Sequence, residues 1–220
     1  MSKLKGLVLV GIVSAGTAAL WPAAGGAATF KGVVVARERD NVLVASPAGL
    51  VRAVRGAAAV GSQVRFASGR ATVVGHTNRA RLNGIVVRHV GRTMFISSNR
   101  HLLALQSNDP TPPPPGTVIS AQVGIANGQL DEQNEDDVGQ VSSGTISVQA
   151  TVSAVAAGAV TLTVQGQTLT VQLPAGLTLP ASIVGQTVTI QLGLAGNDNQ
   201  GQGDQGDDDN GGDHGGGGDG

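Results

Sequence analysis

The chain contains no cysteine and no tyrosine, and only one tryptophan and three phenylalanines occur in its 220 residues. Without cysteine it can form no disulfide bond, no thiolate metal site and no lipid anchor on an N-terminal cysteine. The scarcity of aromatic rings argues against platforms on which bases or sugars stack. We therefore predict no cofactor and no metal site, and we do not expect nucleic acid as a ligand.

Positive charge is absent from the second half of the chain. Every Lys and Arg lies at or before Arg100, whereas the acidic residues concentrate at 131–137 and 198–219, so the net charge of -1 hides a strong segregation. Arginine is the side chain best suited to bidentate contact with phosphate, sulfate or carboxylate. The candidate anion-binding residues are Arg37, Arg39, Arg52, Arg55, Arg65, Arg79, Arg81, Arg88, Arg92 and Arg100. Their expected partner is an anionic envelope polymer or lipid headgroup; the alternative is a solvated surface balanced by the protein's own acidic segments.

The N-terminus has the order of regions found in a signal peptide. Lys3 and Lys5 precede the apolar stretch 6–20, and a run of small residues ends at Ala28, where we expect cleavage. This segment predicts an N-terminal signal helix and a secreted or extracytoplasmic protein. An uncleaved membrane anchor is the alternative, because no charge occurs between Lys5 and Lys31.

From Thr29 onward the sequence shows alternation typical of strands and no helical periodicity. In 160–173, Val and Leu alternate with Thr and Gln on both sides of the turn at Gln165 and Gly166, which predicts a hairpin with one apolar face. The fold class predicted is all-β.

One order of elements occurs three times: an opening strand, two strands of a hairpin, and a final strand introduced by Gly-x-x-Val or Gly-x-x-Ile. The glycines of this mark are Gly61, Gly116 and Gly185. The expected strands are 32–36, 42–45, 50–54 and 61–64 in the first copy, 84–88, 94–97, 102–105 and 116–119 in the second, and 148–153, 160–164, 169–173 and 185–188 in the third.

These copies are too short for a large core of their own, so we expect repeated small antiparallel barrels, OB-like, with four to five short strands each; a sandwich is the alternative. The expected segments are a signal peptide (1–28), a basic module (29–77), a second basic module with a proline-rich loop at 109–116 (78–130), an acidic linker (131–143), an uncharged third module (144–195) and a disordered Gly/Asp/Asn tail (196–220).

The first copy opens with 30–35 (FKGVVV) and closes with 60–66 (VGSQVRF). In these strands the chain resembles uncharacterised bacterial families of exported proteins with repeated small β-barrel domains. The resemblance implies a fold and a compartment, and it implies no functional residue.

The folded region offers little for catalysis. Its histidines are His76, His89 and His101, and none is paired with an acid at a recognisable spacing; no Gly-x-Ser-x-Gly motif occurs. We expect surface histidines on hairpins. The four prolines at 112–115 predict a stiff loop, with a recognition segment as the alternative.

We conclude from the sequence that the protein is a non-enzymatic, exported binding or structural protein of the cell envelope. A self-associating scaffold that uses the uncharged third module is the alternative in another class, because strand edges are usually guarded by charge. An enzyme with an unrecognised site is the remaining alternative. The oligomeric state stays open.

Overall fold

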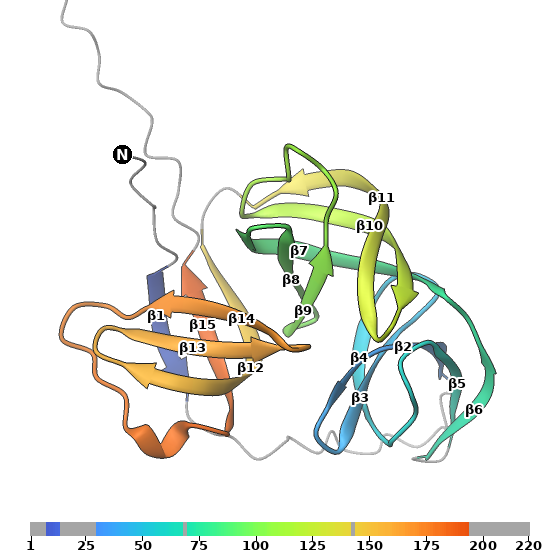
Figure 1. Ribbon diagram of the computed structural model, residues 1–220, viewed down its shortest axis with the longest axis horizontal. Coiled ribbons are helices and arrows are strands. Elements are labelled where there is room, and N and C mark those ends of the chain that lie inside the picture. The colour runs from blue at the N-terminus through green and yellow to red at the C-terminus, as the bar shows by residue number, and fades with distance from the viewer. Residues whose placement is uncertain (1–7, 14–29, 68–69, 142–143, 194–220) are drawn as a thin grey trace, which may run out of the picture.

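The computed structural model describes residues 8–13, 30–67, 70–141 and 144–193 (Figure 1). Within these residues the protein is all-β, as predicted, and the only helical segment is the short 3-10 turn η1 (Ala181–Ile183). The strands are β1 (Val8–Val13), β2 (Phe30–Glu38), β3 (Asn41–Ala45), β4 (Val51–Arg55), β5 (Ser62–Ala67), β6 (Arg70–His76), β7 (Arg79–Val90), β8 (Thr93–Ser98), β9 (His101–Gln106), β10 (Thr117–Ala126), β11 (Gln129–Gln140), β12 (Thr145–Ala156), β13 (Ala159–Val164), β14 (Gln167–Gln172) and β15 (Thr187–Gly193).

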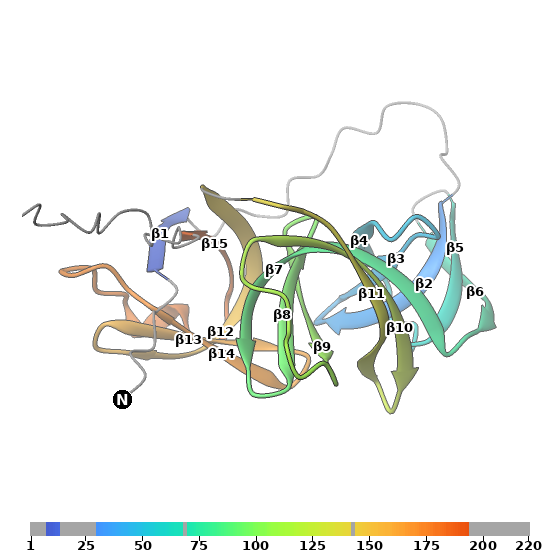
Figure 2. The same ribbon diagram turned by 90° about the horizontal axis from the view of Figure 1, so that it is seen from above.

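The strands fall into three consecutive groups, which we call the first unit (β2–β6), the second unit (β7–β11) and the third unit (β12–β15). The first unit is a five-stranded sheet in the order β4-β3-β2-β5-β6. Among the described strands, those of the second and third units pair at one position, where Gln149 lies parallel to His101. Figure 2 shows the second unit between the other two.

Each unit pairs its strands in the same scheme. The first three strands form a meander, and the first strand also pairs with the fourth, as in β2 with β5, β7 with β10 and β12 with β15. A fifth strand follows the fourth in the first two units. In the second unit this strand, β11, also lies parallel to β9 through Leu130 and Leu105, which closes the ring of five strands.

Three glycines hold the start of the fourth strand against the first. Each of them precedes the fourth strand and has a positive φ of 81 to 93°, which favours glycine. The N–H of each donates over 2.8 Å to a valine carbonyl of the first strand, at the position where that strand has an irregular register with the second strand. The donor and acceptor pairs are Gly61 and Val34, Gly116 and Val86, and Gly185 and Val152. The Gly-x-x-Val/Ile mark thus corresponds to one backbone contact made three times.

The units pack in a row, with the outward face of one strand pair against the interior of the next unit. The outward side chains of β3 and β4 join the core of the second unit, and those of β8 and β9 join the core of the third. These outward residues are Leu43, Ala45 and Val51 in the first unit and Phe95, Leu102 and Ala104 in the second. Because both faces of β8 and β9 are covered, these strands are buried almost throughout.

Both ends of the row carry polar side chains. At the corresponding outward positions of the third unit stand four threonines, namely Thr161, Thr163, Thr168 and Thr170. At the other end, the guanidinium of Arg52 lies 5.2 Å from the ring centre of Phe30, over the core of the first unit. The change from apolar to polar residues therefore coincides with the two ends of the row formed by the described units.

Two sequence expectations differ from the structure. The acidic segment 131–143, expected to be a linker, contributes most of β11, because its backbone pairs with β10 and the preceding Leu130 enters the core. Asp136 and Asp137 are exposed, whereas Glu132 and Glu135 are half-buried and each has one buried carboxylate oxygen without a hydrogen-bond partner. Val8–Val13, expected in a signal helix, forms strand β1, since the edges of β14 and β15 supply backbone partners to this valine-rich segment.

The predicted cleavage position after Ala28 and the tail 196–220 lie outside the described residues. In the part of the chain that is described, no helix has the length and apolar character needed to cross a bilayer.

Candidate functional site

A groove of about 500 Å³ lies between the first and second units. One wall is apolar and comes from the ends of β2 and β3, with Val33, Ala45 and the following Pro47. The other wall is polar and comes from β7, β10 and β11. Its polar side chains are Arg79, Arg81, Gln122, Gln133 and Asn134.

Register places the polar side chains in a row across three strands. Arg81 on β7 lies opposite Gln122 on β10, which lies opposite Asn134 on β11. Arg79 and Arg81 share one side of β7 because they are two positions apart, and Leu82 on the other side is fully buried in the core. The Nε of Arg81 donates to Ser120 Oγ over 3.1 Å, which orients the guanidinium.

A glycine opens room for the polar wall. Gly124 lies opposite Arg79, and a side chain at this glycine would collide with the amide of Gln133, whose nitrogen would be 2.8 Å from the added Cβ. Gln133 therefore lies over Gly124. A smaller hollow of about 190 Å³ adjoins the groove, shares Arg79 and Gln133 with it, and contains Asp131.

The groove itself contains two positive charges and no acidic side chain. Among the described residues, the one contact between a basic and an acidic side chain within 4.0 Å joins His101 and Glu38. Arg79 and Arg81 therefore have no carboxylate partner in the described part of the chain, and the guanidinium groups are available to an anion of suitable size.

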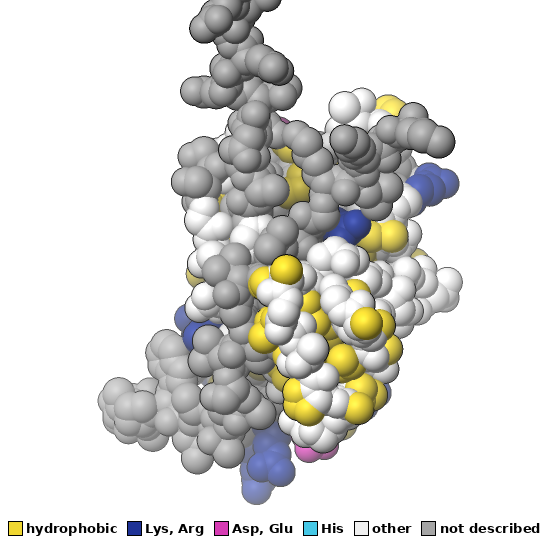
Figure 3. All heavy atoms as spheres, turned by 90° about the vertical axis from the view of Figure 1, so that its left-hand side faces the viewer, with side chains coloured by type: hydrophobic (Ala, Val, Ile, Leu, Met, Phe, Trp, Pro, Cys, Tyr) yellow, Lys and Arg dark blue, Asp and Glu magenta, His cyan; other side chains and the backbone are white. Residues whose placement is uncertain are grey.

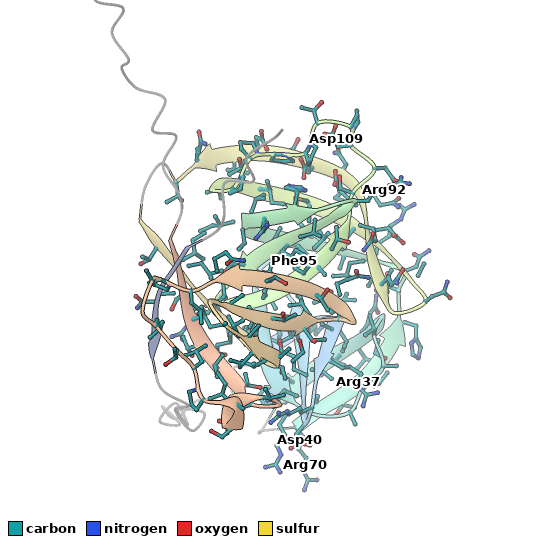
Figure 4. All side chains as sticks on the ribbon, turned by 60° about the vertical axis from the view of Figure 1, so that its left-hand side comes forward. Arg37, Asp40, Arg70, Arg92, Phe95 and Asp109 are labelled. Atoms are coloured by element: carbon teal, nitrogen blue, oxygen red, sulfur yellow. The ribbon has the colours of Figure 1, made fainter. Side chains whose placement is uncertain are left out.

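The ten predicted anion-binding arginines do not form one surface. Arg37 lies toward one end of the molecule in Figure 4, and Arg92 lies toward the opposite end, near Asp109. Only Arg79 and Arg81 of the ten line the groove. The exposed residues elsewhere are Arg37, Arg39, Arg52, Arg55, Arg65, Arg92 and Arg100.

Arg88 and Arg92 contribute hydrogen bonds within the fold. Arg88 Nη1 donates to the carbonyl of Thr170 over 2.9 Å and so links the second unit to the third. Arg92 Nη2 donates to Asn108 Oδ1 at the start of the proline-rich loop. These contacts give both arginines a structural role.

A half-buried acid and a nearly buried histidine meet where the units join. His101 Nδ1 on β9 lies 3.8 Å from Glu38 Oε2 at the end of β2, although the two are far apart in sequence. Burial raises the pKa of Glu38 to about 7. Burial, and then the charge of Arg100, lower the pKa of His101. Both groups thus favour their neutral forms, and neither lines the groove.

The expectation of surface histidines is right for His76 and wrong for His101, which is 9% exposed. His89 is half-buried; its Nε2 lies 3.0 Å from the carbonyl of Pro113, and burial lowers its pKa despite that contact. Pro113 is itself buried, and the prolines belong to the loop between β9 and β10. In the described part of the chain, no three His, Asp or Glu side chains gather to hold a metal ion.

No family model, no curated protein and no solved structure matches this chain. We therefore infer function from the geometry of the groove. The sequence indicated Arg79 and Arg81 but not the three amides of the groove. Gln133 and Asn134 belong to the segment expected to be a linker, and Gln122 lies beside Arg81 only through the register of β7 and β10.

Proposed function

We propose that the chain consists of three copies of one OB-like unit and belongs with the exported families of repeated small barrels. The common pairing scheme supports this, including the parallel contact of third and fifth strands in the second unit. The three glycine-to-valine hydrogen bonds support it further, since each lies at the same place in the scheme.

We propose that the protein acts outside the cytoplasm as a non-enzymatic binding protein for an anionic polymer of the cell envelope. The observation that carries this is the pair Arg79 and Arg81, which line one groove beside amide side chains and have no carboxylate within 4.0 Å among the described residues, although Asp131 lines the adjoining hollow. Guanidinium and amide groups together offer donors to phosphate, sulfate or carboxylate and to the hydroxyls of a saccharide. A groove recessed between two units suits a polymer segment better than a flat lipid surface.

The surface that OB folds usually present to nucleic acid is unavailable in the second unit. That surface is the face of the second and third strands. Here the corresponding strands β8 and β9 bury Phe95, Leu102 and Ala104 against the third unit. The position of Phe95 inside the molecule is visible in Figure 4. We therefore favour a saccharide or phosphate polymer over nucleic acid.

The pair of Glu38 and His101 has the composition of a general acid and base, but its burial argues against catalysis. A substrate needs access to the reacting groups. His101 is almost covered, and neither hollow reaches it. We propose that this pair is structural and that the protein has no enzymatic activity.

The test compares two double variants with equal loss of charge. Arg79→Gln with Arg81→Gln removes both charges from the groove, whereas Arg37→Gln with Arg55→Gln removes two exposed charges elsewhere. On phosphocellulose, the wild type and the control pair should elute at similar salt concentrations, and the groove pair should elute much earlier. If both variants lose retention equally, the net charge of the protein rather than the groove determines binding, which would contradict the proposal. Binding to vesicles of anionic phospholipid, without binding to soluble polyphosphate, would favour a lipid ligand.

A further inference from the structure

In the part of the chain that the structure describes, no strand follows β15 in the third unit. The first two units continue directly from the fourth strand into β6 and β11, respectively. After Ala195 the sequence contains only Gly, Asn, Asp, Gln and one His, and none of these residue types favours strands. The tail is therefore unsuited to supply the missing strand.

Strand β1 occupies the position of the missing strand. It pairs antiparallel with β15, where Val13 lies opposite Thr189, and parallel with β14, where Val8 lies opposite Gln172. In the second unit, β11 has the same relation to β10 and β9, antiparallel to one and parallel to the other. Figure 1 shows β1, from the start of the chain, beside β15 from its end.

Without β1, the third unit would present two unpaired strand edges and an open core. Val171 and Ile190, on the two strands that β1 joins, are fully buried. Natural proteins commonly protect such edges with proline, or with lysine and other charged residues. No charged residue occurs from Val138 to Asn197, so these edges carry no such protection.

The surface of this region agrees with that view. Figure 3 shows the side of the molecule that carries the third unit, where the coloured side chains are mostly hydrophobic or uncharged and the charged ones lie toward the margins. Unprotected edges in a neutral surface are suited to backbone pairing with an additional strand.

We infer that the edges of β14 and β15 form a strand-acceptor site for an extended apolar peptide, and that residues 8–13 of the same chain are its resident occupant. The inference rests on the proposed five-stranded unit and is independent of anion binding. The occupant belongs to the segment with the signal-peptide pattern, so cleavage after Ala28 would remove it and leave the site open. A chain that has been cleaved after Ala28 can therefore no longer complete its third unit with its own β1.

Disulfide trapping tests the assignment in the full chain, which has no cysteine of its own. Val13→Cys with Thr189→Cys places cysteines at register partners, whose Cα atoms in an antiparallel pair lie about 5 Å apart. Val13→Cys with Gln191→Cys is the control. Gln191 is displaced by two residues, or about 7 Å along β15, from the residue opposite Val13, so its Cα is too far from that of Val13 for a disulfide. Cell-free synthesis keeps residues 1–28 attached.

Mild oxidation should crosslink the matched pair within one chain and leave the control pair reduced. Free thiols in both variants, or equal crosslinking of both, would overturn the assignment. A crosslinked dimer from the matched pair would also overturn it, since the occupant would then come from a second copy.

A peptide experiment tests the acceptor site separately. In the full chain, Val10→Pro with Ile12→Pro removes two N–H groups from β1, and amides at the edges of β14 and β15 should exchange about tenfold faster, while amides of β7 and β8 serve as an internal control for folding. A synthetic peptide of residues 2–15 should restore protection, and the same peptide with both prolines should not. If neither peptide changes the exchange rate, the acceptor site does not exist; the resin experiment on Arg79 and Arg81 is unaffected by either result.

Discussion

At the scale of single residues, the burial of Glu38 and of His101 makes stability depend on pH. Burial raises the pKa of Glu38 to about 7, so the folded state holds the proton more tightly than the unfolded chain. The stabilisation is complete below the ordinary pKa of a glutamate and is lost as the pH rises through about 7. The lowered pKa of His101 has the opposite sign, because its contribution is lost as the pH falls below the ordinary pKa of histidine.

Glu38→Gln should isolate the glutamate's contribution. At pH 4 the variant and the wild type should have similar free energies of unfolding, because Glu38 is then protonated in the folded state and largely protonated in the unfolded chain, where its ordinary pKa is 4.5. At pH 8 the variant should be the more stable by roughly 1 to 2 kcal/mol, a figure reduced for partial solvent access. Urea unfolding at the two pH values measures this. A difference between the proteins that does not change with pH would contradict the proposed titration.

At the scale of elements, close strand crossings depend on particular glycines. A Cβ on Gly84 of β7 would lie 2.9 Å from the carbonyl oxygen of Ser97 on β8, and backbone atoms cannot move aside cheaply. Gly32 of β2 has the corresponding conflict with the carbonyl of Ala45. By contrast, a Cβ on Gly139 of β11 would meet no atom within 4 Å.

Gly84→Ala should therefore lower the free energy of unfolding by about 1 to 3 kcal/mol through overpacking. The same change at Gly139 should be neutral or stabilising by up to about 1 kcal/mol, because alanine restricts the unfolded chain. Thermal or urea unfolding of the two variants measures the contrast. Equal effects at both sites would show that the crossing of β7 over β8 is looser than described.

Sequence reasoning predicted four strands in each copy and missed the fifth. The four carry alternating Val, Ile and Leu, a local pattern that burial on one face requires. β11 has a single buried leucine among acidic and amide residues, and it is a strand because β10 and β9 pair with its backbone. Such partners are distant in sequence, so neither β11, the amide wall of the groove nor the contact of Glu38 with His101 could be predicted from local pattern.

At the scale of the whole molecule, one side chain connects all three units. Gln165, in the turn between β13 and β14, accepts the N–H of Ala104 with its Oε1 over 3.0 Å, and its Nε2 donates to the carbonyl of Val35 over 3.2 Å. The third unit thereby contacts both the second and the first. The shared hydrophobic clusters and this amide together hold the row of units and the groove between two of them.

Gln165→Asn shortens that side chain by one carbon while keeping a residue that tolerates the positive φ of 51° at this turn. Both hydrogen bonds should be lost, and the free energy of unfolding should fall by about 1 to 3 kcal/mol because the N–H of Ala104 loses its partner. Gln172→Asn, on an exposed position of β14, is the matched control. If both variants unfold at the same denaturant concentration, Gln165 does not couple the units.

The central claim is that Arg79 and Arg81 bind an anionic polymer in the groove, and the salt dependence of affinity tests it most directly. For a linear polyanion such as polyphosphate, the logarithm of the binding constant falls linearly with the logarithm of the salt concentration, and each lost cation contact reduces the slope by about one. We expect a slope smaller by about two for Arg79→Gln with Arg81→Gln, and an unchanged slope for Arg37→Gln with Arg55→Gln. Equal slopes for the two double variants would contradict it.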